Sequence, residues 1–189
     1  MRMQVSAALF ALVLLPTLAA ASTPNGWFLA GSDPRSYRIE RDTSVVRDGK
    51  ASGLLASTAP PKGFGTMMQS FDPGEYLGKR LRLSAWVKAK DVKSWAGVWM
   101  RVDAKDKMSI AFDNMQSRPI QGTRDWKRYD IVLDVADNAS GISFGILMEG
   151  EGKVWLNDLQ FEIVDASVPV TSTYPSSQLK KPTNLDFGN

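Results

Sequence analysis

Hydrophobic and polar residues alternate along most of the chain, in short runs bounded by Gly, Pro, Asn or Asp. This period of two is typical of β-strands, and no apolar stripe of helical period continues beyond about two turns. The pattern predicts ten strands, over residues 27–30, 36–42, 52–57, 65–72, 81–89, 94–103, 108–113, 126–135, 141–149 and 153–164. We therefore expect an all-β domain, a two-sheet antiparallel sandwich.

The alternation also predicts which side chains form the core. The inward sets are Leu81, Leu83, Ala85 and Val87; Ala96, Val98, Met100 and Val102; Ile110 and Phe112; and Ile142, Phe144, Ile146 and Met148. Trp86, Trp99 and Arg101 fall on the opposite phase and should face outward. The apolar phase shifts within residues 153–164, which predicts a β-bulge near Asn157 and Asp158.

The two ends of the chain differ from this pattern. Residues 1–21 resemble a secretory signal peptide, with Arg2, an apolar run too short to span a membrane, and small residues before Ser22. We expect export of a bacterial protein to the periplasm or the medium, with the sandwich over residues 22–165. Residues 166–189 are rich in Pro, Ser, Thr and Lys and predict an extended tail.

Composition narrows the chemistry. The 189 residues include 23 Lys and Arg against 20 Asp and Glu, a net charge of +3 without a clustered basic face, which argues against nucleic-acid binding. The absence of Cys and His removes disulfides, thiol nucleophiles, zinc sites and Ser/His/Asp triads. A carboxylate pair could still cleave glycosides, with Asp113, Glu149, Glu151 and Asp158 as candidates, but we expect no catalysis.

The segments "DWKRYDIVLDV" and "SFGILMEGEGKVWLNDLQFE" resemble the C-terminal half of galactose-binding-like jelly rolls, which include many carbohydrate-binding modules. In that family the last strand has an Asp-Asp pair followed by alternating apolar residues. Here Asn157 stands in place of the first Asp. The resemblance implies a jelly-roll fold and a carbohydrate or glycan ligand.

A narrower resemblance links "GFGTMMQ", "WAGVWMRVD" and "FDNMQSRPIQGTRDW" to a bacterial domain known mainly from proteins in which it is attached to a transcriptional regulator. This chain shows no helix-turn-helix pattern, so we do not transfer the regulator's role. Related jelly rolls carry a motif like "NLDFE" at their start, whereas "NLDFGN" ends this chain. We expect residues 184–187 to return across the sandwich as an edge strand; a remnant of a second copy is the alternative.

Sugar binding requires aromatic faces to stack on a pyranose ring and polar groups to bond its hydroxyls. Trp86, Trp99 and Arg101 are predicted as the platform and clamp, on strands where Gly97 leaves room. The polar run from Asp113 supplies the hydroxyl partners, which are Asp113, Asn114, Gln116 and Arg118. Each set also has a structural interpretation, as tryptophans packed under a loop and as a hydrogen-bonded turn.

Two further questions stay open at this stage. We expect no cofactor. A structural calcium ion is common in the modules that the chain resembles, and Asp158 and Glu162 with Asp33 or Asp42 are possible ligands. The outward face could also meet another protein, as an interaction or structural module of the cell envelope. We expect no membrane-spanning segment in the mature chain.

Overall fold

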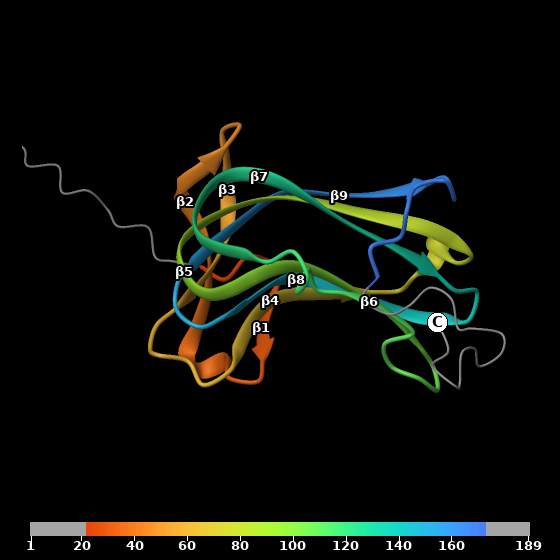
Figure 1. Ribbon diagram of the computed structural model, residues 1–189, viewed down its shortest axis with the longest axis horizontal. Helices are drawn as coiled ribbons and strands as arrows, with labels where there is room; N and C mark the ends of the chain where they lie inside the picture. Colours follow the sequence, from red (N-terminus) through yellow and green to blue (C-terminus); the bar gives the residue numbers. More distant parts are fainter. Residues whose placement is uncertain (1–21, 173–189) are drawn as a thin grey trace, which may run out of the picture.

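The computed structural model describes residues 22–172, which form a sandwich of antiparallel strands in two layers (Figure 1). The leader expected at residues 1–21 and the edge strand expected at 184–187 lie outside the described residues. The strands are β1 (Phe28–Gly31), β2 (Tyr37–Arg47), β3 (Lys50–Ser57), β4 (Phe64–Phe71), β5 (Lys79–Ala104), β6 (Ala111–Asp113), β7 (Ile120–Val135), β8 (Ala139–Glu149) and β9 (Lys153–Val164). Two 3₁₀ turns, Pro34–Ser36 and Gly74–Tyr76, precede β2 and β5. The predicted all-β sandwich is confirmed.

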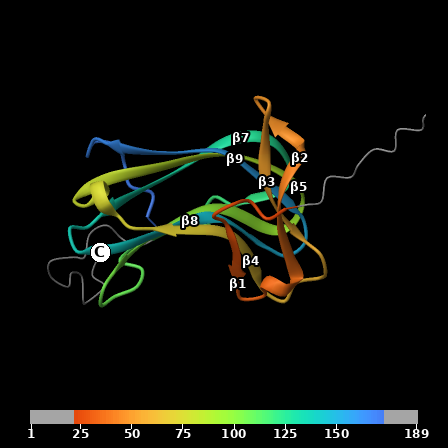
Figure 2. The same cartoon turned by 180° about the vertical axis from the view of Figure 1, so that it is seen from behind.

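The long strand β5 belongs to both layers. Its first half, to Lys90, pairs with β7 and β9, and β9 continues through β3 to β2. Its second half, from Trp95, pairs with β8, and β8 continues through β4 to β1. The strand thus carries the chain around one side of the sandwich, as Figures 1 and 2 show at the end where β5 bends. The two strands predicted over residues 81–89 and 94–103 are therefore one.

The core lies between the layers, and strand parity predicted most of it. The inward residues of both halves of β5 and those of β8 are all buried, as are Ile131 and Leu133 of β7. Phe144 forms edge-to-face contacts with Trp27, Phe71 and Phe161. The expected bulge is also confirmed, because the β5–β9 register shifts opposite Asn157 and Asp158, where Asp158 has a φ of 48°.

Phe112 was wrongly predicted as a core residue. Its strand β6 pairs with β5 so that Phe112 lies opposite Arg101, which is on the outward phase. Residues opposite each other in an antiparallel ladder share a face. Phe112 therefore lies on the outer face of the layer, while the neighbouring Ile110 packs against the core as predicted.

After β9 the chain returns along the open side of the sandwich. Arg80 donates hydrogen bonds to the carbonyl oxygens of Ala166 and Val168, and the Thr171 amide donates to the Val132 carbonyl of β7. Ser172 then donates to the carbonyl oxygen of Phe112 in β6. This segment thus connects the exposed edges of the two layers. Within residues 22–172, no helix has the length and apolar character needed to cross a membrane.

Candidate functional site

A groove of about 530 Å³ lies on the outer face of the layer built from β1, β4, β8 and the second half of β5. Its walls carry the outward-phase side chains of these strands. The aromatic and polar groups that line it are Phe64, Trp95, Trp99, Arg101, Asn114 and Glu149, with Phe112 from β6. Aromatic surface and separated polar groups are thus combined in one concave site.

Trp99 forms the floor of this groove. The residue is only 6% exposed, and its indole N–H donates to the Thr66 hydroxyl at 2.8 Å. That hydroxyl donates in turn to the Ile146 carbonyl at 3.0 Å. Because its N–H already has a partner, Trp99 offers a ligand little more than the small exposed part of its ring.

Trp95 and Glu149 form one end of the groove. They are opposite each other on β5 and β8, and the Trp95 indole N–H donates to Glu149 Oε2 at 3.0 Å. Trp95 is half-buried and lines the groove. The pair therefore places an aromatic side chain beside a carboxylate that can accept hydrogen bonds from hydroxyl groups.

Arg101 lies at the other end, six residues along β5 and so about 20 Å from Trp95. Its Nε donates to Asp103 Oδ2 at 3.0 Å, and the Asp103 carboxylate also accepts from the Ser109 amide at 2.6 Å. Among the described residues, Nη1 and Nη2 of Arg101 have no hydrogen-bond partner. The groove thus has donors at one end and a carboxylate acceptor at the other.

The polar residues predicted to bind hydroxyls, from Asp113 to Arg118, lie in different environments in the structure. Asp113 is fully buried and accepts hydrogen bonds from Arg118, so it cannot contact a ligand from this position. Asn114 lines the groove, and its role as a hydroxyl partner stays a prediction. Gln116 is exposed to solvent and does not line the groove.

Trp86 lies on the other layer. It pairs with Arg128 of β7 and Asn157 of β9, and the Arg47 guanidinium stacks on its ring at 3.9 Å. The shared platform predicted for Trp86 and Trp99 was therefore wrong, because β5 crosses between the layers after Lys90. Two outward residues of one strand consequently face opposite sides of the molecule.

Gly97 has a role different from the predicted open space. A Cβ atom at this position would lie 2.4 Å from the main-chain oxygen of Asn114, so the loop after β6 rests directly on the sheet here. Glycine permits this close approach. The sequence left the role of Trp95 undecided, although this residue shares the phase of Trp99 and Arg101 in the same strand.

The acidic candidates for catalysis or calcium binding are dispersed. Asp113 is inside the fold, Glu149 lies in the groove, and Asp158 is on the other layer beside Arg47, at 3.4 Å. Glu162 pairs with Arg82 at 2.5 Å. Asp33 accepts from the Ser36 hydroxyl and the Lys62 amide, and Asp42 from the Trp155 indole N–H. Across residues 22–172, no three acidic side chains converge as a metal site would require.

Several solved structures of similar shape are carbohydrate-binding modules. The CBM22-1 xylan-binding domain of Paenibacillus barcinonensis Xyn10C superposes with a TM-score of 0.58 and 14% identity, over 76% of this chain and 89% of that domain. TmCBM61, solved with β-1,4-galactotriose, has a TM-score of 0.51 and 11% identity, over 74% and 90%. The fold is that of the β-sandwich carbohydrate-binding modules.

The chain is also similar to two proteins that are not described as carbohydrate-binding modules. The enzymatically active domain of bacteriophage CBA120 tailspike protein 4 matches with a TM-score of 0.57 and 14% identity, over 74% of this chain but 20% of that one. In sequence, the chain is 48% identical over 165 residues to the uncharacterised HTH-type transcriptional regulator YbfP of Bacillus subtilis (strain 168). The match covers 86% of this chain and 56% of YbfP. No family model matches the sequence.

Proposed function

We propose that this protein is a non-catalytic module that binds a carbohydrate chain in the groove on the outer face of the β1, β4, β8 and β5 layer. The main observation in support is that Trp95, Asn114 and Arg101 line one concave site. Trp95 supplies an aromatic surface for a sugar ring, and Arg101 and Asn114 supply donors for its hydroxyls. The sugar-binding neighbours of the same fold support this proposal.

The location outside the cytoplasm, in the periplasm or the medium, is part of the proposal. It rests on the leader pattern in residues 1–21. Cell fractionation of the full chain, with and without these residues, tests it. The protein should leave the cytoplasm only when the leader is present, and recovery of the full chain in the cytoplasm would contradict export.

The experiment on binding is calorimetric titration of the protein with xylohexaose and with β-1,4-galactotriose. Replacing Trp95 with alanine should weaken binding roughly 30-fold, because truncating an aromatic side chain that stacks on the ligand costs about 2 kcal/mol or more. Trp86→Ala is the matched control, since it removes a tryptophan from the opposite face and should leave the affinity unchanged. Equal losses in both variants would contradict the proposed site.

A protein-interaction surface is the second candidate. Phe28 and Phe64 are 47% and 38% exposed, and both lie on strands of this layer. Exposed aromatic side chains beside a groove also occur where proteins meet. If neither sugar binds, while Phe64→Asp abolishes association with a protein partner, this second function replaces the first.

A further inference from the structure

We propose that the ion pair between the buried Asp113 and the partly exposed Arg118 positions the wall of the groove on its β6 side. The pair would thereby set the affinity for a glycan that it does not touch. The inference rests on the proposed function. It deepens that function by assigning a positioning role to two residues that the sequence had suggested as direct ligand contacts.

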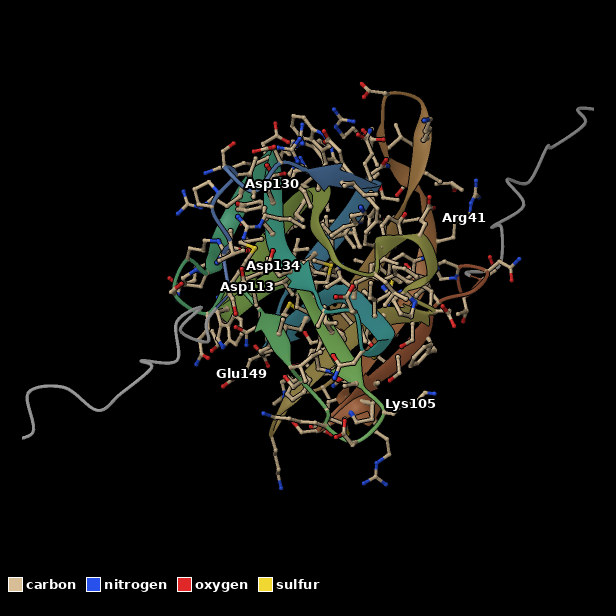
Figure 3. All side chains as sticks on the ribbon, turned by 90° about the vertical axis from the view of Figure 1, so that its right-hand side faces the viewer. Arg41, Lys105, Asp113, Asp130, Asp134 and Glu149 are labelled. Carbon is tan, nitrogen blue, oxygen red and sulfur yellow. The ribbon has the colours of Figure 1, made fainter. Side chains whose placement is uncertain are left out.

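Asp113 is held from several directions beneath the groove surface. Its side chain is 0% exposed, and its carboxylate accepts hydrogen bonds from Arg118 Nη1 at 3.1 Å, Arg118 Nη2 at 2.6 Å and the Met115 amide at 2.8 Å. Arg118 also donates to the main-chain oxygen of Asp130 in β7, at 3.3 Å. Figure 3 shows Asp113 and Asp130 on the same side of the molecule. A buried carboxylate with these partners fixes residues 113–118 as a closed turn.

This turn lies where the edge of the sheet is interrupted. Strand β6 pairs with β5 at residues 100–102, and the pairing of β7 with β5 reaches no further along β5 than Ala96. The turn is the neighbour of β5 between these points, and its Asn114 carbonyl lies against Gly97. The Met115 side chain, also 0% exposed, enters the core from a left-handed backbone conformation with φ of 62°. The turn is thus fixed at Gly97, at Met115 and by the ion pair.

The consequence for the groove is a fixed Asn114 side chain. Its Oδ1 accepts a hydrogen bond from the Gln116 amide at 3.1 Å, so its Nδ2 is left as a donor at the groove wall. Within residues 22–172, Nδ2 of Asn114 has no hydrogen-bond partner. Loss of the ion pair would release the turn and misplace this donor, although neither Asp113 nor Arg118 lines the groove.

Hydrogen–deuterium exchange of the full chain tests the positioning role without any ligand. Asp113→Asn keeps the side-chain shape but removes the charge that holds Arg118. Amide exchange of residues 114–118 should become at least about 10-fold faster, while β9 exchanges as in the wild type. Asp134→Asn, which breaks the Arg80–Asp134 ion pair between β5 and β7, is the matched control. Unchanged exchange in the turn of Asp113→Asn would overturn the inference.

Titration with xylohexaose, well below the melting temperature of every variant, tests the effect on the site. Asp113→Asn should bind about 10-fold more weakly and Asp134→Asn as tightly as the wild type. Gly97→Ala displaces the same wall and should weaken sugar affinity by a similar factor. The double variant should lose no more affinity than either single variant, because both changes act on one turn. Wild-type affinity in Asp113→Asn, or fully additive losses, would overturn the inference. Absence of sugar binding by the wild type would instead overturn the proposed function.

Discussion

Replacing Trp99 with phenylalanine tests whether this residue is the floor of the groove or an exposed platform. The change removes the indole N–H that donates to the Thr66 hydroxyl at 2.8 Å. A net buried hydrogen bond contributes about 1 kcal/mol. The smaller ring also leaves unfilled volume at a site that is 6% exposed, which costs about 1 kcal/mol more. We expect a loss of about 2 kcal/mol in the free energy of unfolding.

Thermal and urea unfolding followed by circular dichroism measure this loss. For a domain of this size, about 2 kcal/mol lowers the melting temperature by roughly 4–8 °C. Trp86→Phe is the control, because Trp86 lies on the other layer at a half-buried position where Arg47 can still stack on the smaller ring. Its loss should stay under about 0.5 kcal/mol.

A double-mutant cycle with Thr66→Val isolates the hydrogen bond itself. Thr66→Val removes the acceptor and leaves the Trp99 N–H buried without a partner. The free energy of unfolding lost in the double variant should therefore be smaller than the sum of the two single losses by about 1 kcal/mol. A melting temperature of Trp99→Phe equal to that of the wild type would refute the reasoning. Strict additivity of the two changes would refute it as well.

Two further predictions concern the other layer. Burial alone would raise the pKa of Asp42, but hydrogen bonds that include those from Ser44 and Trp155 outweigh it and lower the pKa from 3.8 to about 2. The stability that the lowered pKa contributes is complete above about pH 4 and is lost as the pH falls through 2. The free energy of urea unfolding should therefore depend less on pH between 2 and 4 in Asp42→Asn than in the wild type. An unchanged dependence on pH would contradict these hydrogen bonds as the cause. Arg47→Ala removes the cation stacked on Trp86 and should cost about 1 kcal/mol in urea unfolding without changing sugar affinity, and a loss of affinity would place the sugar on that layer.

Strand parity predicted the core because the side-chain period of a strand is local. Leu81 to Val87 and Val98 to Val102 needed only the alternation along the chain, and so did the bulge at Asp158. Phe112 was misplaced for a related reason. Its face depends on which residue of β5 lies opposite it, and that register is set by the turn between β5 and β6 rather than by the three residues of β6.

The site was harder to predict because it depends on where β5 changes layers. The alternation gave Trp86 and Trp99 the same phase, but phase does not show that the strand bends around the sandwich between them. Asp113 is polar and lies in a loop near the groove, so the sequence suggested an exposed side chain. Its burial depends on the ion pair with Arg118, which only the structure shows. Trp95 could have been found, since it follows the parity that selected Trp99.

Titration of the isotope-labelled protein with xylohexaose, followed through its indole N–H signals by NMR, tests the central claim most directly. If the groove on the outer face of the β1, β4, β8 and β5 layer binds the sugar, the Trp95 signal should shift strongly. The Trp99 signal beneath it should shift less, and the Trp86 signal on the other face should stay in place. A shift of Trp86 with Trp95 unchanged, or no shift at any indole signal, would contradict the account.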